Sequence, residues 1–176
     1  DAPRQAVALA GLQHHVRRTK GKGATMLIFG ALLLVFCHLV FAFVLPASHS
    51  HLIAYATIVV LGVSFSLVPA ALWPSVPKII DEKILGSAYN LIFWVQNIGL
   101  CLVPMLIGSV LTSSNLDNPA VVAAKASGAE FIPYNYTIPL IIFACFGVAA
   151  FFIALYLKAI DKKMGLNLEK PNIVKD

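Results

Sequence analysis

The sequence has few charged residues, and four long stretches of it contain none. Only 12% of its 176 residues are Asp, Glu, Lys or Arg, whereas 59% are hydrophobic, and the mean hydropathy is +0.84. A soluble domain carries roughly 25% charged and about 45–50% apolar residues. A core of ordinary size cannot absorb this excess of apolar side chains, and the surface would lack charge. This composition excludes a water-soluble enzyme, a DNA-binding domain and a disordered tail, and it indicates an integral membrane protein.

The charge-free stretches are long enough to cross a bilayer. They cover residues 24–45, 52–77, 86–111 and 138–157. Each has about 20 residues or more, and a helix of that length spans a hydrocarbon core of about 30 Å. The apolar runs are continuous, whereas barrel strands would alternate in polarity. The sequence therefore predicts an all-α, polytopic membrane protein with four transmembrane helices between residues 24 and 160.

Basic residues are distributed unevenly among the connecting segments. All but one of the 13 Lys and Arg residues lie before the first stretch, between the second and third, or after the fourth, and the exception is Lys125. Because basic residues concentrate on the cytoplasmic side, we expect a cytoplasmic basic segment at 1–23, an external loop at 112–137 and a cytoplasmic tail at 161–176. Both termini are then cytoplasmic, in a bacterial cytoplasmic membrane or an organelle membrane.

Two of the connecting segments carry local signals of their own. Asn118 followed by Pro119 is typical of a helix start, and Gly128 is typical of a stop, so we expect a short helix over 119–127. The tail after Ile160 is polar, and we expect it to fray.

Prolines interrupt the second and third stretches. Pro69, Pro74 and Pro77 surround Trp73, and Pro104 lies in the third stretch. Each proline removes a backbone hydrogen bond and clashes with the preceding turn, so these helices should bend or break there. We expect the four prolines to act as hinges.

Polar and aromatic side chains on the second and third stretches recur at helical spacing. A lone helix in lipid would not favour them, so their face should pack on other helices or line a cavity. Two interpretations remain open, namely helix packing alone and a path for a substrate. The candidate path residues are Ser66, Trp73, Tyr89, Asn90, Phe93, Gln96 and Asn97.

Groups for bond-making chemistry are scarce within the stretches. They contain no Asp or Glu, and His38 is their one conventional acid–base group. His38 either binds and releases a proton during transport or packs as a hydrogen-bonded side chain. Cys37, Cys101 and Cys145 form no CxxC pattern and serve as small apolar residues. We therefore expect no enzymatic activity, no metal site and no cofactor.

Three motifs follow one another along the second and third stretches. They are Leu72-Trp73-Pro74, Leu85-Gly86-Ser87-Ala88-Tyr89 and Gln96-Asn97-Ile98-Gly99-Leu100. Their order and spacing resemble the tenth and eleventh helices of the major facilitator superfamily. Within that family, the branch that contains the lysosomal dipeptide transporter and its bacterial relatives is the most similar. The resemblance covers about residues 21–163, and it implies that the four stretches are helices nine to twelve of a twelve-helix carrier.

The resemblance also implies a mechanism and partners. Carriers of this family work by alternating access, in which two six-helix halves rock about a midplane site. The chain would then be a fragment of a secondary-active or facilitative transporter for small peptides or similar organic solutes. Its partners would be the lipid bilayer, the solute and the remaining eight helices, and not nucleic acid. Gly21 and Lys22 match the end of the family's cytoplasmic gate motif, but Arg18 occupies its acidic position. The alternative is a complete four-span structural or assembly protein without transport activity.

Overall fold

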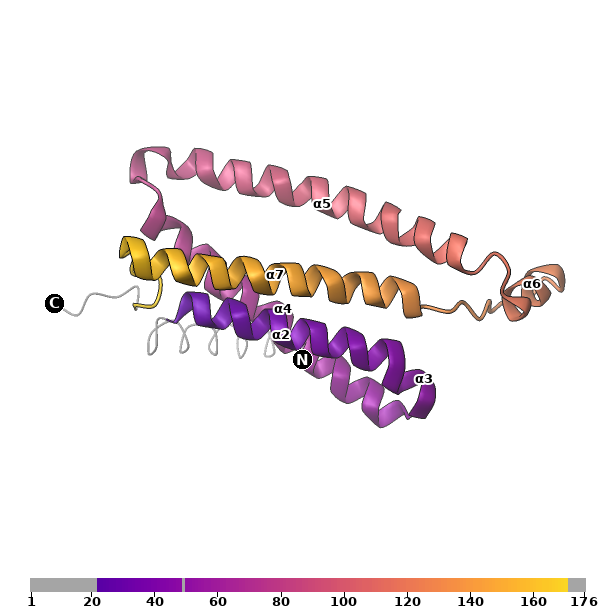
Figure 1. Cartoon of the computed structure of the whole chain (residues 1–176). Coiled ribbons are helices and arrows are strands. Elements are labelled where there is room, and N and C mark those ends of the chain that lie inside the picture. Colours follow the sequence, from indigo (N-terminus) through magenta and orange to yellow (C-terminus); the bar gives the residue numbers. More distant parts are fainter. Residues whose placement is uncertain (1–21, 49, 171–176) are drawn as a thin grey trace, which may run out of the picture.

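The computed structural model describes residues 22–48 and 50–170, and the regular structure of these residues is helical (Figure 1). Four of the described helical segments are long and apolar enough to cross a membrane. This confirms the all-α, polytopic fold. The elements are α2 (Gly23–Leu39), the π-helical turn η1 (Val40–Val44), α3 (Leu45–Ser48), α4 (His51–Ile79), the 3-10 turn η2 (Glu82–Ile84), α5 (Leu85–Ser114), α6 (Pro119–Ala126) and α7 (Thr137–Met164).

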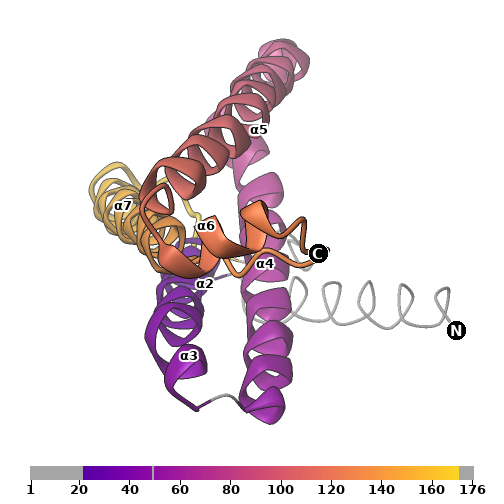
Figure 2. The ribbon, with the colours of Figure 1, turned by 90° about the vertical axis from the view of Figure 1, so that its right-hand side faces the viewer.

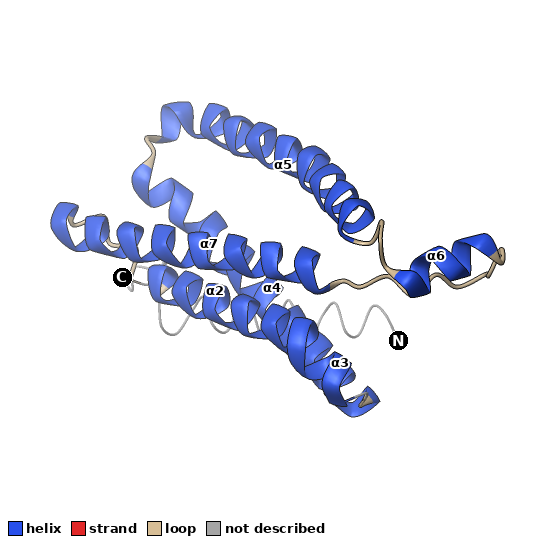
Figure 3. Cartoon of the chain, turned by 45° about the vertical axis from the view of Figure 1, so that its right-hand side comes forward, coloured by secondary structure: helices blue, strands red, loops and turns tan. Residues whose placement is uncertain are grey.

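The helical segments contain the charge-free stretches and extend beyond them. The four candidate spans are Gly23–Ser48, His51–Ile79, Glu82–Ser114 and Thr137–Met164. A helix does not end where hydrocarbon ends, because its backbone hydrogen bonds continue to satisfy one another in the headgroup region and in water. The predicted short helix is confirmed by α6 (Figure 3). Its first residue is Pro119, and the Asn118 side chain accepts a hydrogen bond from the Ala120 amide at 3.1 Å.

Helix α2 lies between α4 and α7 and packs along both of them (Figure 2). Small residues bring the backbones close together. The buried Ser64 of α4 donates a hydrogen bond to the Gly30 carbonyl oxygen of α2 at 2.7 Å. On the other side of α2, a Cβ placed on Gly147 of α7 would lie only 2.7 Å from the Cγ2 of Val35. Close backbone approach through small residues is how helices associate in lipid, where burial away from water contributes little.

We expect Gly147→Leu to destabilise the contact between α2 and α7. The added side chain must displace Val35, and overpacking of this kind costs about 1–3 kcal/mol. The measurement is thermal unfolding in detergent, with Gly62→Leu as the matched control because a Cβ on Gly62 meets no atom within 4 Å. Equal destabilisation by the two variants would contradict this account of the interface.

Helix α5 makes few contacts with the other helices. It has no buried residue, and it lies apart from α2 along most of its length (Figure 1). From the sequence we expected a polar face of the second and third stretches to pack on other helices or to line a cavity. In the structure the first stretch forms the central helix, because its small residues let both neighbours approach, whereas α5 has no buried residue and packs only loosely on α4 and α7.

The prolines do not interrupt their helices. Helix α4 is continuous through Pro69, Pro74 and Pro77, and α5 is continuous through Pro104. We expected these helices to bend or to break at the prolines, and the structure shows that they do not break. Each proline removes one backbone hydrogen bond, and the bonds of the adjoining turns hold the helix together. A hinge role of these prolines stays a prediction.

The chain after α7 is ordered as far as residue 170, so the expectation of a frayed tail is wrong for residues 161–170. Helix α7 continues to Met164, and Gly165 ends it in the left-handed conformation at φ 66°. The turn brings the Leu168 amide to the Asp161 carboxylate, where it donates a hydrogen bond at 3.0 Å. No local pattern of residues marks this fold-back, because it depends on contacts with α2 and α4.

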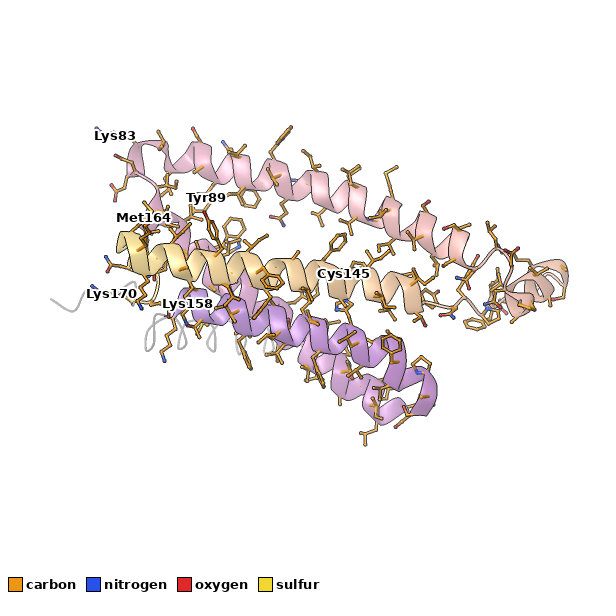
Figure 4. All side chains as sticks on the ribbon, in the orientation of Figure 1. Lys83, Tyr89, Cys145, Lys158, Met164 and Lys170 are labelled. Atoms are coloured by element: carbon orange, nitrogen blue, oxygen red, sulfur yellow. The ribbon has the colours of Figure 1, made fainter. Side chains whose placement is uncertain are left out.

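Lysines gather at one end of the long helices. Figure 4 shows Lys83, Lys158 and Lys170 at the same end, whereas α6, which carries Lys125, lies beyond the other (Figure 1). Consecutive long helices run in opposite directions, so the lysine-rich connecting segments lie at one end of the helices and the segment with Lys125 lies at the other. Which end faces the cytoplasm stays a prediction.

Candidate functional site

Three of the predicted path residues meet between α4 and α5. The ring of Trp73 lies 5.8 Å from that of Tyr89 and 5.1 Å from that of Phe93, measured between centroids. Tyr89 and Phe93 are four residues apart, so they share one face of α5. We call Trp73, Tyr89 and Phe93 the aromatic cluster. Such tilted pairs at this separation attract each other by about 0.5–1.5 kcal/mol beyond the area they bury.

A hydrogen bond accompanies the ring contacts. The Tyr89 hydroxyl donates to the Trp73 backbone carbonyl oxygen at 3.2 Å, and Tyr89 lies on the side of α5 that faces α4 (Figure 4). In a regular helix this carbonyl would accept from the amide of residue 77, but residue 77 is proline and has no amide hydrogen. The hydroxyl of Tyr89 therefore supplies the donor that Pro77 removes. This pairing of a proline with a tyrosine on the next helix was missed in the sequence, although the proline position alone identifies the free carbonyl.

The other predicted path residues do not join the aromatic cluster. Ser66 donates to the Val63 carbonyl oxygen of its own helix at 2.8 Å. Asn97 donates to the Phe93 carbonyl oxygen at 2.8 Å. Asn90 and Gln96 are exposed on α5 and have no side-chain hydrogen bond within the described part of the chain. The side-chain amides of Asn90 and Gln96 are therefore available to a ligand or to a neighbouring helix.

A shallow groove runs between α5 and α7, further along from the aromatic cluster. Its volume is about 670 Å³, and its lining is almost entirely apolar. It contains Gln96 from the predicted path and Pro104 from the predicted hinges. The lining residues are Gln96, Gly99, Leu100, Val103, Pro104, Ile107, Gly108 and Phe143. The groove places one amide among apolar side chains, which suits an organic solute or a helix face rather than an ion.

His38 is held by its own helix. Its Nδ1 lies 2.7 Å from the Leu34 carbonyl oxygen, and because a carbonyl only accepts, Nδ1 carries the hydrogen. Its ring lies 5.4 Å from that of Phe143 on α7. Both features fit the packing interpretation. A proton-binding role for His38 stays a prediction.

The predicted gate motif lies only partly within the described residues. Gly21 lies outside them. Lys22 immediately precedes α2, is exposed, and makes no side-chain cap on that helix. The residues described here contain no group of three or more His, Cys, Asp or Glu side chains able to hold a metal ion.

A second pocket lies at the end of the bundle away from the aromatic cluster, and we did not anticipate it. Its volume is about 890 Å³, and it contains none of the predicted path residues. It is lined by Phe41, Leu45, Pro46, Ser50, His51, Ala54, Tyr134, Asn135, Tyr136, Thr137 and Leu140. These come from η1, α3, the beginning of α4, the segment before α7 and the beginning of α7. Such a combination of segments arises only in the folded chain, so no sequence motif marks it.

A buried asparagine ties the two ends of the long loop together at this same end. Asn115, which is 1% exposed, donates to the Asn135 carbonyl oxygen at 3.0 Å and accepts from the Asn135 amide at 2.8 Å. Its amide also donates to the Leu111 carbonyl oxygen at 2.9 Å. The side chain thus pairs with both backbone groups of Asn135 and fixes where α7 begins relative to the end of α5.

Comparison with known proteins identifies relatives of one segment of the chain. Over 53 residues, which are 30% of this chain and 11% of the relative, it is 45% identical to the lysosomal dipeptide transporter MFSD1 of Mus musculus. Over 53 residues, with the same coverage, it is 42% identical to that of Homo sapiens. Over 51 residues, 29% of this chain and 11% of the relative, it is 45% identical to that of Danio rerio. No family model matches the chain, and no solved structure matches it.

These similarities confirm the resemblance to the major facilitator superfamily, of which these relatives are members. The matched segment spans about a ninth of their length. The relatives are named as transporters and not as enzymes. With four helices able to span a membrane, the chain is an integral, multi-pass membrane protein with a segment related to transporters.

Proposed function

We propose that the chain is part of a solute carrier that works by alternating access, either secondary-active or facilitative. Helices α2, α4, α5 and α7 then correspond to helices nine to twelve of a twelve-helix carrier, and both termini face the cytoplasm. The substrate class is small peptides or similar organic solutes, as the name of the relatives suggests for them. The membrane is a bacterial cytoplasmic membrane or that of an organelle.

The observation that carries this proposal is the aromatic cluster together with the unpaired amides beside it. Aromatic rings at the α4–α5 contact offer a surface for apolar side chains, and the exposed amides of Asn90 and Gln96 offer donors and acceptors for a peptide backbone. The charge-free stretches 24–45, 52–77, 86–111 and 138–157 contain no carboxylate. Residues outside these stretches would therefore bind the charged ends of a peptide and supply any proton-coupling carboxylate.

The exposed surface of α5 supports the same proposal. A membrane helix with polar residues and no buried face is unfavourable in lipid unless other helices or a hydrated path cover it. In a twelve-helix carrier the remaining eight helices supply that cover. A complete four-span structural protein, the alternative, must instead cover α5 by association with copies of itself.

Uptake into proteoliposomes tests the proposal. We expect the full-length protein to accumulate or equilibrate a labelled dipeptide faster than protein-free vesicles do, and unlabelled dipeptides to compete. Free amino acids and sugars serve as solute controls. No uptake of any small solute, combined with a stable oligomer formed by the four-helix chain alone, would contradict the carrier and favour the structural alternative.

A further inference from the structure

Residues 165–170 fold back over the lysine-rich ends of the helices. Leu168, at their centre, has no exposed surface. Its amide donates to the Asp161 carboxylate of α7 at 3.0 Å, and its carbonyl oxygen accepts from the Gly23 amide of α2 at 3.2 Å. A polar tail that merely trailed into solvent would leave these backbone groups to water. Here they are paired, and they join the end of α7 to the beginning of α2.

Glu169 caps α2. Its carboxylate accepts from both the Thr25 amide and the Thr25 hydroxyl at 3.0 Å, and the Lys158 ammonium of α7 donates to that hydroxyl at 2.8 Å. The first amides of any helix lack partners within the helix, and a negative charge there also interacts favourably with the helix dipole. Because Lys22 provides no side-chain cap, this cap comes from a residue 144 positions away along the chain.

Lys78 attaches the same segment to α4. Its ammonium donates to the Asn167 carbonyl oxygen at 3.2 Å and to the Lys170 carbonyl oxygen at 2.6 Å. The junction is also tightly packed, since a Cβ on Gly23 would lie 3.1 Å from the Leu168 carbonyl oxygen and 3.2 Å from the Ser75 hydroxyl. The segment therefore contacts α2, α4 and α7 at one point.

We propose that residues 165–170 form a clasp that fixes the lysine-rich ends of α2, α4 and α7 as one rigid unit, and that these three ends move together when the carrier changes conformation. The second part rests on the proposed function, whereas the first does not. No hydrogen bond between the clasp and α5 is found among the described residues. At this end α5 joins the unit through the short connection that contains η2 and through the aromatic cluster with its Tyr89 hydrogen bond.

Hydrogen exchange on the full-length protein tests the clasp without any assumption about transport. We expect Glu169→Ala to make the Thr25 and Gly23 amides exchange about five- to tenfold faster, as loss of a helix cap does. Glu169→Gln keeps an acceptor and should have a smaller effect. Glu82→Ala is the matched control, because Glu82 is an exposed carboxylate at the same end. Equal exchange in Glu169→Ala and Glu82→Ala would overturn the clasp.

Cross-linking tests whether the three ends move together. In a variant with alanine at Cys37, Cys101 and Cys145, Thr25→Cys and Glu169→Cys are joined with a short reducible thiol reagent. We expect the cross-linked protein to retain dipeptide uptake within about twofold of its reduced form. Loss of uptake that reduction restores would show that the clasp must open, which overturns a rigid unit. If the unmodified carrier shows no uptake, the proposed function fails, and the exchange result alone decides the clasp.

Discussion

Trp73→Ala is expected to raise the KM for dipeptide uptake by the full-length carrier roughly 30-fold, which corresponds to about 2 kcal/mol. Trp73 is the member of the aromatic cluster that contacts both others, so its removal takes away the α4 side of the proposed binding surface. Truncation of a central aromatic residue at a binding site commonly costs 2 kcal/mol or more. The measurement is the initial rate of uptake into proteoliposomes as a function of dipeptide concentration.

A second tryptophan provides the control. Trp94 lies on α5, is 65% exposed, and is not part of the cluster, so Trp94→Ala should change KM much less. Asn97→Ala should weaken uptake only a few-fold, because its amide already bonds to its own helix and one neutral hydrogen bond is worth about 1 kcal/mol. Unchanged KM in both Trp73→Ala and Asn97→Ala would remove the site assignment and leave the transporter class standing.

The four spans could be predicted from the sequence because one physical constraint determines them. Charge at membrane depth is costly, and the runs between charged residues match the bilayer thickness. The same reasoning could not give the ends of the helices, since α4 continues to Ile79 past Lys78 and α7 continues to Met164 past Asp161. Beyond the hydrocarbon, helix ends depend on local caps and on tertiary contacts rather than on hydropathy.

The substrate path stays a prediction, and the structure shows only which of its residues lie together. Tyr89 and Phe93 share one face of α5, and the aromatic cluster brings them together with Trp73. Periodicity could not show that Asn97 satisfies its amide on its own helix. It also could not show which helix would be central, because that depends on where small residues of different helices meet, as at Ser64 and Gly30.

The features missed entirely are contacts between distant parts of the chain. Glu169 and Thr25 are 144 residues apart, and Asn115 and Asn135 are 20 apart. Each is an ordinary polar residue in a polar segment, and nothing in its neighbourhood distinguishes it from a solvated one. Such residues acquire a structural role only when the helices are packed, which is why the tail was expected to fray.

Tyr89→Phe is expected to destabilise the contact between α4 and α5 by about 1 kcal/mol, and Pro77→Ala is expected to abolish most of that effect. Phenylalanine keeps the ring in the aromatic cluster but leaves the Trp73 carbonyl oxygen without a donor. An unpaired buried carbonyl costs about 1–3 kcal/mol, although measured values for hydrogen bonds between membrane helices average about 0.6 kcal/mol. Alanine at position 77 restores a backbone amide four residues after Trp73, so the helix can satisfy the carbonyl by itself.

The two changes therefore form a double-mutant cycle with a predicted sign. Equilibrium unfolding of the full-length protein in mixed detergent micelles gives the free energy of unfolding for the parent, both single variants and the double variant. The coupling energy should favour the pair of Tyr89 and Pro77 by about 0.5–1.5 kcal/mol, because the hydroxyl matters only where the proline is present. Ser66→Ala, which loses a bond within α4 alone, should show no coupling to Pro77→Ala. Additive effects of Tyr89→Phe and Pro77→Ala would mean that the hydroxyl does not replace the missing amide, and the link between α4 and α5 would then rest on the ring contacts alone.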